Sequence, residues 1–471
     1  MSVDLEIAEN RIQNQIEARS RALESRALRG TFFLVAFYGA SLGLRLVGSV
    51  ILARLFPPEL FGLMTLLTTI IVGLNLFSHI GFQDSVIQNA RGDDEPFLNT
   101  AWTIQAMRGI ALWLLIAVGA WPIAHFYDRR LLWLLPVVGF TCVISGFSSP
   151  GLLSLTRHLG VARSSLLDFV SGVTTYAVAI GWALFDRTIL ALVAARLASE
   201  VVRTWLSYGL MKNAVRPRFV LERDALRSLL TFGRWIMIGT ALTFLANQSD
   251  RLILPKLLPK PIAFQTLGVY GIAFALSDLP RQIIAMFTAK VGFPFIAKFA
   301  DQPRAQFRAV LIKYRGMVLA VGALLLTFTI CVGDIFILHM YKEPYHGAAW
   351  MIAIFGLGLW HTLLYSTTSP AVMSLQKSHY NALANLLYFV TLVCLLPLGY
   401  HQFGMVGAVA AVAISDLPVY VVNVWASYRE GVGMLRQDVL MTLVFAGTLA
   451  VGFFIRHLCG LGFPFPGIPH I

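Results

Sequence analysis

The sequence predicts an all-α polytopic membrane protein with two parallel six-helix lobes around a central cavity and one extra C-terminal helix. Three observations lead to this prediction. Of the 471 residues, 57% are hydrophobic and 13% are charged, against roughly 25% charged residues in an ordinary soluble domain. Many apolar runs reach the roughly 20 residues that cross about 30 Å of hydrocarbon. Three stretches also recur, in the same order, in the two halves of the chain.

Residues 1–30 form a polar segment ahead of the first apolar run. The segment contains five arginines and lacks an apolar core of its own, so we expect it to be cytoplasmic and expect no cleavable signal peptide. An amphipathic helix that binds lipid and a solvated basic tail that only fixes topology both fit this composition.

Breaks between apolar runs divide the rest of the chain into thirteen predicted spans. Residues 31–211 form an N-terminal lobe, and residues 229–428 form a C-terminal lobe after a basic cytoplasmic linker, 212–228. Residues 429–471 add one more span and a short tail rich in Pro and Gly. The predicted spans lie near 31–56, 60–80, 105–126, 131–155, 165–185, 188–210, 229–252, 267–292, 315–340, 347–373, 380–400, 404–427 and 437–457.

Loop charge orients these helices, because Lys and Arg resist translocation. With the N-terminus in the cytoplasm, the inner loops include the linker and five bases from Lys298 to Arg315. The predicted outer loops hold fewer bases, and the longest of them runs from Ser249 to Thr266. The net charge of +13 is therefore mostly a feature of the inner face, and a nucleic-acid partner is not needed to explain it.

An internal repeat supports the two lobes. The stretch Ser148 to Val170 aligns without a gap on Thr368 to Val390 with nine identities, where membrane composition alone gives about two. The stretch ALVAARLASEVV from Ala191 matches GAVAAVAISDLP from Gly407, and a proline-rich turn near Pro57 returns near Pro259. Because each unit has six helices, both units have the same orientation, as in parallel repeats with a site between the lobes.

Several ionisable residues lie well inside predicted spans, where a charge near mid-bilayer costs about 2.5–3.5 kcal/mol and normally faces a cavity or a partner. Guanidinium suits a phosphate or diphosphate, because it stays charged and offers a fork of donors. We expect cavity cations that bind an anionic headgroup, and the candidates are Arg45, Arg196, Arg203 and Arg281. Glu200, Asp278 and Asp416 are candidates for charge pairing or for binding a coupling H+ or Na+.

Local pairing is an alternative for four of these residues. Arg196 with Glu200 is spaced i, i+4, and Asp278 with Arg281 is spaced i, i+3, so each pair can neutralise itself on one helical face. Arg45 has no acidic residue at these spacings, which leaves a partner from the other lobe or an anionic ligand.

Two repeated Ser-Pro pairs place Pro150 and Pro370 inside the fourth and tenth predicted spans. Proline removes a backbone donor and kinks a helix, so both prolines are candidate hinges, although a kink needed only for packing explains them equally well. The histidines, including His361, lack metal-ligand spacing. We expect no metal site and no cofactor beyond a coupling ion.

Several diffuse stretches give the chain a family resemblance. They are ILARLFPPELFGLMTLLTTIIVGLNLFSHIGFQDSVIQ from Ile51, ANQSDRLILPKLL from Ala246 and LGVYGIAFALSDLP from Leu267. Across roughly 30–430 the chain resembles the polysaccharide transporters of the multidrug/oligosaccharidyl-lipid/polysaccharide (MOP) flippase superfamily, the Wzx-like flippases.

The resemblance implies a flippase of the bacterial inner membrane that works by alternating access. Such a protein translocates undecaprenyl-diphosphate-linked oligosaccharide repeat units for O-antigen, capsule or exopolysaccharide synthesis. It implies a lipid-linked oligosaccharide and membrane lipids as partners, allows a polysaccharide polymerase and a chain-length regulator, and implies that the chain is not an enzyme.

Two other function classes remain open. A cation-coupled drug or metabolite exporter of the same superfamily would favour acidic cavities, whereas the charges within these predicted spans are mostly basic. An integral-membrane polysaccharide polymerase or glycosyltransferase would need a large external loop with catalytic acids, and Asp250 is the one acid between Ser249 and Thr266. The chain also lacks a P-loop motif for ATP hydrolysis.

Overall fold

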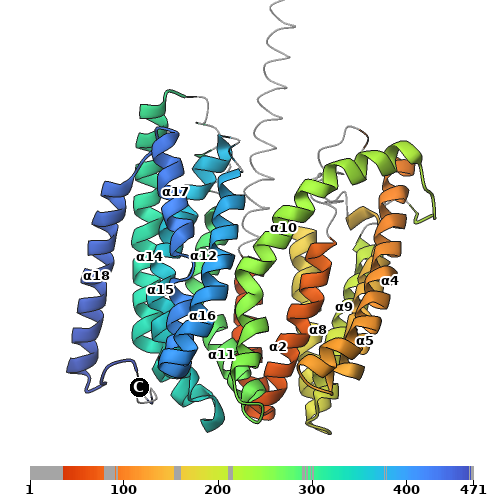
Figure 1. The fold of residues 1–471 in the computed structure, drawn as a ribbon, viewed down its shortest axis with the longest axis horizontal. Helices are drawn as coiled ribbons and strands as arrows, with labels where there is room; N and C mark the ends of the chain where they lie inside the picture. Colours follow the sequence, from red (N-terminus) through yellow and green to blue (C-terminus); the bar gives the residue numbers. More distant parts are fainter. Residues whose placement is uncertain are drawn as a thin grey trace, which may run out of the picture. The chain divides into compact units, whose positions relative to one another are not determined.

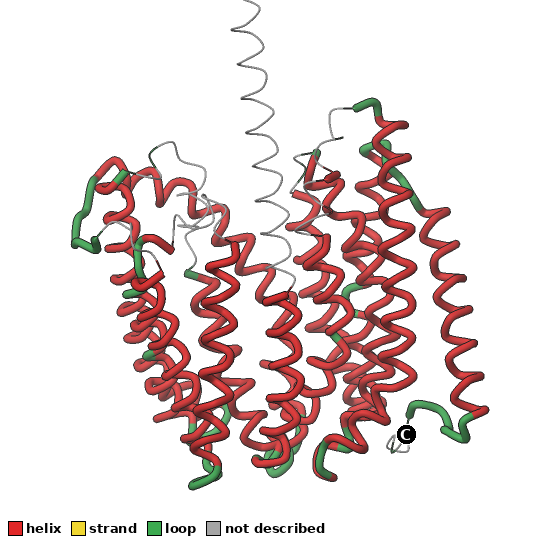
Figure 2. The backbone as a smooth tube through the Cα atoms, turned by 180° about the vertical axis from the view of Figure 1, so that it is seen from behind, coloured by secondary structure: helices red, strands yellow, loops and turns green. Residues whose placement is uncertain are grey.

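The computed structural model describes residues 36–78, 91, 94–152, 161–210, 216–288, 292, 295–296, 299, 302–375, 377, 379–465 and 467. Throughout this part of the chain every regular element is a helix (Figure 2), which confirms the predicted all-α class. The predicted segment 1–30 and parts of the 212–228 linker lie outside the described residues.

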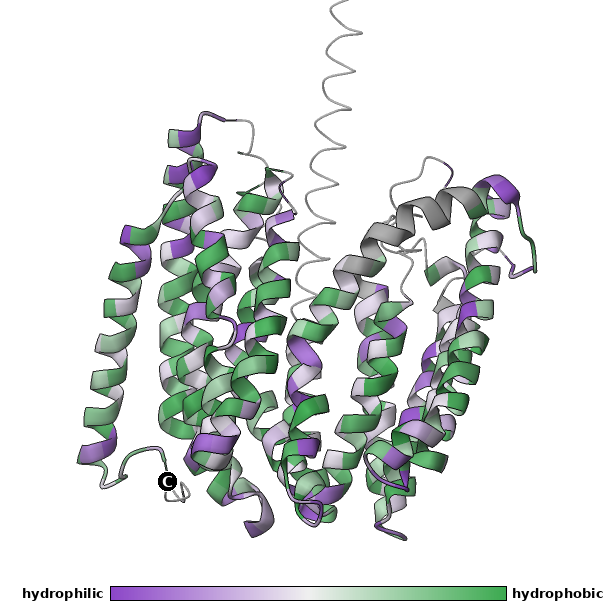
Figure 3. Ribbon diagram, viewed as in Figure 1, coloured by the Kyte–Doolittle hydropathy of each residue, from purple (hydrophilic) through white to green (hydrophobic). Residues whose placement is uncertain are grey.

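Eight helical stretches in the described chain are long and apolar enough to cross a membrane, so the protein is a multi-pass membrane protein. Hydrophobic residues dominate their ribbons, and hydrophilic residues gather mainly near helix ends and in loops (Figure 3). The stretches are Ala36–Leu55, α2 (Pro58–Phe77), α4 (Glu95–Phe126), α8 (Val161–Ala183), α14 (Arg304–Met340), α15 (Ala348–Ser374), α16 (His379–Ile414) followed by α17 (Leu417–Arg429), and α18 (Leu435–Leu458).

The chain forms two compact units. Unit 1 comprises Met1–Leu52, Ile80–Gly119 and Leu135–Arg234. Within it α9 (Ile189–Leu210) packs along α8, and the short helix α6 (Thr141–Gly146) packs against α9 (Figure 1).

Unit 2 comprises Ala53–His79, Ala120–Leu134 and Trp235–Ile471. It contains α2, most of α10 (Arg223–Leu257), α11 (Ala263–Ser277), α12 (Leu279–Phe287) and the helices from α14 to α18 (Figure 1). The predicted lobes 31–211 and 229–428 describe internal repetition, and that division stays a prediction.

Two glycines let α2 and α11 cross closely. A Cβ atom on Gly62 would lie 1.9 Å from the carbonyl oxygen of Phe264, and one on Gly268 would lie 2.0 Å from that of Pro58. Only glycine permits such an approach of two backbones. The Pro-Pro-Glu turn at Pro57 thus leads into a helix that is fixed against α11.

Beside this crossing, a charged cluster ties the start of α2 to the turn before α5 (Leu131–Gly139). Arg130 donates to Glu59 at 2.7 Å and to Asp128 at 3.0 Å. Burial alone would raise the pKa of Asp128, but the hydrogen bonds from Arg130 outweigh burial and hold the pKa of that carboxyl below its usual value.

Helix α18 is joined to α14 by two buried ion pairs. Arg315 Nη2 donates to Asp438 Oδ1 at 2.7 Å, and Arg456 Nη2 donates to Asp334 Oδ2 at 2.8 Å. Arg315 had been expected among the cytoplasmic loop bases, but α14 begins at Arg304 and buries its side chain completely. The prediction is wrong because α14 extends further toward the N-terminus than the apolar run, which begins at Arg315.

Three predicted boundaries also differ from the structure. The predicted outer loop 249–266 is helical as far as Leu257, because α10 continues through Pro255. The predicted span 131–155 is interrupted at Phe140 and its helix α6 ends at Gly146. The predicted span 267–292 is divided between α11 and α12.

Candidate functional site

The tetrapeptide Ser-Asp-Leu-Pro occurs twice, at 277–280 and 415–418, and interrupts helices in unit 2 both times. The first copy separates α11 from α12, and the second separates α16 from α17. Each proline occupies the first turn of the following helix, where its missing N–H is tolerated but a continuing upstream helix is not. Each break therefore places an aspartate at the same position relative to a helix start.

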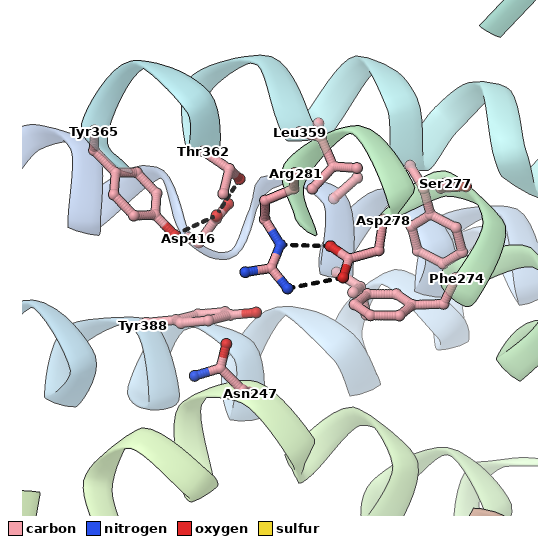
Figure 4. A pocket seen from close by; sticks show the side chains of 14 residues that line it. Asn247, Phe274, Ser277, Asp278, Arg281, Leu359, Thr362, Tyr365, Tyr388 and Asp416 are labelled. Atoms are coloured by element: carbon pink, nitrogen blue, oxygen red, sulfur yellow. Dashed lines mark hydrogen bonds and ion pairs between the residues drawn. The ribbon is translucent and has the colours of Figure 1, made fainter. Parts of the chain in front are cut away.

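Both aspartates line one cavity. The cavity has a volume of about 60 Å³ and is walled by α10, α11, α12, α15 and α16. Asp278 is 5% exposed and Asp416 is 8% exposed. Figure 4 shows Arg281 reaching between them, with Tyr388 and Asn247 on the opposite wall. A cavity of this size has room for water beside polar partners.

Asp278 and Arg281 form a two-point ion pair. Arg281 Nε donates to Oδ1 of Asp278 at 2.5 Å, and Nη2 donates to Oδ2 at 2.8 Å. Gln282 adds a third donor to Oδ2 at 3.0 Å. The predicted pairing of Asp278 with Arg281 is confirmed, and this carboxylate is neutralised by its own helix.

Asp416 is held by three side chains of α15. Thr362 Oγ1 donates to Oδ2 at 2.6 Å, the Tyr365 hydroxyl donates to the same oxygen at 3.3 Å, and His361 Nε2 bonds Oδ1. None of these partners carries a permanent positive charge. Asp416 is therefore held by two hydroxyls and an imidazole, whereas Asp278 is held by an arginine.

The cavity combines an arginine–aspartate ion pair with an aspartate–histidine pair. Helix breaks at membrane depth leave backbone groups that only a polar cavity or other protein groups can satisfy. Buried ionisable residues there are typical of ion, proton or substrate pathways. The arrangement can bind a small cation or move a proton, and it can exchange the Asp278 partner of Arg281 for an anion.

The other predicted site residues belong to unit 1. Arg45 lies on the helical stretch Ala36–Leu55 and Arg196 lies on α9, and both side chains are exposed. Arg203 Nη2 donates to Asp168 Oδ1 at 3.1 Å. Glu200 is buried, and among the described residues no ion pair joins it to Arg196, so the alternative of local pairing is not formed there.

The two candidate hinges occupy different settings. Pro370 lies inside α15, as predicted. Pro150 lies in a turn after α6, so its placement within a continuous span is wrong. In that turn the Ser149 amide donates to Ser207 Oγ at 3.0 Å. The serine side chain thereby accepts a hydrogen bond from a buried backbone N–H group that lies outside a helix.

Sequence reasoning missed most of the residues around the two aspartates. His361 was expected in a core or interface role, and Thr362, Tyr365, Tyr388 and Asn247 were not singled out. The repeated Ser-Asp-Leu-Pro tetrapeptide was the available signal. Among the residues that the structure describes, no group of three His, Cys, Asp or Glu side chains has the grouping of a metal site.

Sequence comparison relates this chain to proteins of polysaccharide synthesis. Residues 51–350 match the profile of a family described as polysaccharide biosynthesis protein. The teichuronic acid biosynthesis protein TuaB of Bacillus subtilis is 24% identical over 273 residues, which cover 57% of this chain and 55% of TuaB. The succinoglycan biosynthesis transport protein ExoT of Rhizobium meliloti is 22% identical over 276 residues, which cover 57% and 53%. The chain thus spans about half the length of these relatives.

Structure comparison identifies the fold. The lipid II flippase MurJ in an inward closed conformation matches with a TM-score of 0.71 and 12% identity over 91% of this chain and 93% of MurJ. An inward-facing multidrug resistance MATE family transporter of the MOP superfamily matches with a TM-score of 0.65 and 14% identity over 82% and 93%. The helices described above are therefore arranged as in MOP superfamily transporters.

Proposed function

Because this chain belongs to the polysaccharide biosynthesis protein family, we propose that it is a flippase for undecaprenyl-diphosphate-linked oligosaccharide repeat units. It would move them from the cytoplasmic to the periplasmic leaflet of the bacterial inner membrane, with its own N-terminus in the cytoplasm. The product would be a surface polysaccharide of the O-antigen, capsule or exopolysaccharide type. Two six-helix lobes with alternating access and a thirteenth helix form the framework of this proposal.

The observation on which the proposal rests is the buried charged cluster at two helix breaks inside a membrane-spanning unit. A lipid-linked saccharide needs a polar path for its headgroup only, because the prenyl chain can stay in the lipid. The Asp416–His361 pair offers a place where a proton can be taken up and released. We assign this pair to coupling by H+, with Na+ as the alternative ion.

Binding of the diphosphate is assigned to Arg45 and Arg281, with Arg196 and Arg203 in support. The Arg281 guanidinium already holds a carboxylate at two points, which is the geometry that a phosphate group would take over. Arg45 and Arg196 have exposed side chains. Arg203 would first have to leave Asp168, so we expect its contribution to be smaller.

Transport into proteoliposomes tests this proposal. The purified chain is reconstituted, and flipping of a fluorescent undecaprenyl diphosphate saccharide is followed with and without an imposed pH gradient. We expect the gradient to accelerate flipping in the wild type and to have no effect on Asp416→Asn. If flipping is absent in the wild type, the proposal is wrong, and if Asp416→Asn still responds to the gradient, only the coupling assignment is wrong.

Complementation in cells tests the arginines. Arg45→Ala and Arg281→Ala, expressed at the wild-type level in a flippase-null strain, should reduce surface polysaccharide. Full restoration by Arg45→Ala would remove Arg45 from the binding site.

An exporter of small cationic compounds is the second candidate. The two acids that share a cavity with one arginine favour it, as does the fold shared with a MATE family transporter. Drug efflux in a hypersensitive host separates the two candidates, because a flippase for lipid-linked saccharides should confer no resistance there. A polymerase or glycosyltransferase is less well supported, because the longest predicted outer loop is reduced to residues 258–262 between α10 and α11, which leaves no room for a catalytic loop at that place.

A further inference from the structure

A second groove lies within unit 2, beside the cavity of the two aspartates, because Phe274 lines that cavity and Arg251 of the groove lies over the Phe274 ring. It has a volume of about 310 Å³ and lies between α2 and α10. Ligand pockets in proteins begin at about 300 Å³, so the groove is large enough for a small polar group. Its walls are Phe61, Met64, Thr65, Thr68, Thr69 and Val72 from α2, with Gln248 and Arg251 from α10.

The threonine hydroxyls of this groove are not used by their own helix. Threonine inside a helix often donates to the carbonyl four residues earlier, as Thr329 does to Leu325 at 2.9 Å. The hydroxyls of Thr65, Thr68 and Thr69 make no hydrogen bond to any residue that the structure describes. They share one face of α2, on which Thr65 and Thr68 are partly exposed and Thr69 is buried.

Arg251 supplies the groove's positive charge. Its Nη1 donates to Gln248 Oε1 at 2.8 Å, and its guanidinium lies 5.3 Å from the centre of the Phe274 ring. Its Nε is buried without a hydrogen-bond acceptor in the described part of the chain. A buried donor without an acceptor is unfavourable, so an oxygen-rich ligand at this position would supply the missing hydrogen bond.

We infer that this groove is a saccharide subsite. Neutral hydroxyls and an amide suit sugar hydroxyls, which both donate and accept, and the apolar surfaces of Phe61 and Met64 suit the C–H face of a sugar ring. A diphosphate would call for several cations, whereas the groove contains Arg251 alone. The subsite binds one sugar residue of the headgroup, with Arg251 donating to a ring or substituent oxygen. This inference rests on the proposed function.

Lipid binding to the purified full chain tests the subsite. Native mass spectrometry compares the affinities for two probes, undecaprenyl diphosphate and undecaprenyl diphosphate N-acetylglucosamine. We expect the wild type to bind the glycosylated probe more tightly. Thr65→Val with Thr68→Val removes two hydroxyls at nearly constant shape, and this double variant should lose about fivefold or more in affinity for the glycosylated probe while its affinity for undecaprenyl diphosphate is unchanged.

Three controls separate a binding role from a folding role. Thr68→Ser keeps the hydroxyl and should bind both probes with the wild-type affinities. Thr329→Val, on α14, removes a hydroxyl that already has an acceptor and should leave both affinities unchanged. Arg251→Gln keeps a polar side chain without the charge and should weaken binding of the glycosylated probe only.

The outcomes distinguish the two proposals. Equal affinity of the wild type for both probes, or an unaltered preference in the groove variants, overturns the saccharide subsite and leaves the flippase proposal standing. Parallel loss of both probes in the groove variants also overturns it, because the shared diphosphate would then be the ligand. If the wild type binds neither probe, the proposed function itself is wrong.

Discussion

Replacing Asp438 by Asn tests how strongly the ion pair between α14 and α18 stabilises the protein. The Arg315 side chain is completely buried, and Asp438 is 4% exposed. After the substitution the guanidinium would keep only neutral acceptors, namely the Thr367 hydroxyl at 3.1 Å, the Gln437 amide oxygen at 3.1 Å and the Leu364 carbonyl at 3.0 Å.

Loss of one partner from a buried pair costs about 3–5 kcal/mol, because the other charge remains without compensation. Since three neutral acceptors remain around Arg315, we expect a value near the lower end, about 3 kcal/mol. Replacing both partners, as in Arg315→Met with Asp438→Leu, should cost less than Asp438→Asn alone, because no charge is then left buried.

Unfolding in mixed micelles with increasing SDS measures these free energies. Trp360 stacks on Phe445 of α18 with 4.4 Å between ring centres, so tryptophan fluorescence reports the contact of α18 with the rest of unit 2. Glu59→Gln breaks a half-exposed pair with Arg130 and serves as control, with an expected loss of about 0.2–1 kcal/mol. If Asp438→Asn lost no more than this control, the reasoning from burial would be refuted.

Three further predictions concern packing, pH and the hinge. Gly268→Ala should lower the thermal stability of the purified protein, because the new Cβ would lie 2.0 Å from the Pro58 carbonyl oxygen. Gly271→Ala, whose Cβ would lie 3.5 Å from Thr65 Oγ1, should leave the melting temperature unchanged. Equal melting temperatures of the two variants would contradict this prediction. The pKa of Asp128 is lowered, so its hydrogen bonds to Arg130 stabilise the fold fully above the ordinary pKa of 3.8. This stabilisation is lost as the pH falls toward the pKa of the folded state. Asp128→Asn should therefore reduce the loss of stability at acid pH, and an unchanged dependence of stability on pH would refute the prediction. Pro370→Ala restores a backbone donor inside α15; a hinge role predicts slower flipping in proteoliposomes without loss of stability, and a packing role predicts unchanged flipping.

The sequence predicted where helices lie better than where they stop. The predicted span 437–457 corresponds to α18, which runs from Leu435 to Leu458, because length and hydropathy locate a span. The break at Asp278 was missed, since an apolar run on both sides hides the effect of Pro280. Arg315 was misplaced for a related reason, because its buried partner Asp438 lies on a distant helix that sequence spacing cannot reveal.

The candidate site was predicted in part. Membrane depth singled out Asp278, Arg281 and Asp416, which the cavity brings together. The role of His361 follows from the position of α15 beside the second break. The availability of the α2 threonine hydroxyls follows from the absence of hydrogen bonds between them and the described residues. Neither property is local to the sequence, so both required the structure.

The resemblance to polysaccharide transporters of the MOP superfamily is confirmed by the family match and by the shared fold. The substrate and the coupling ion stay predictions, since less than three-fifths of each relative is covered and the folds match at 12–14% identity. The experiments above address each of them separately.

The two ion pairs of α18 also have a consequence for the order of synthesis. Helix α14 ends at Met340 and α18 begins at Leu435, so a ribosome that adds about 5–20 residues per second needs roughly 5–20 s to make the segment between them. During that interval Arg315 and Asp334 have left the ribosome without the carboxylate and the guanidinium that later neutralise them. We therefore expect the nascent α14 to remain in a polar setting until α18 has been made, so that the two helices enter the bilayer with their charges paired.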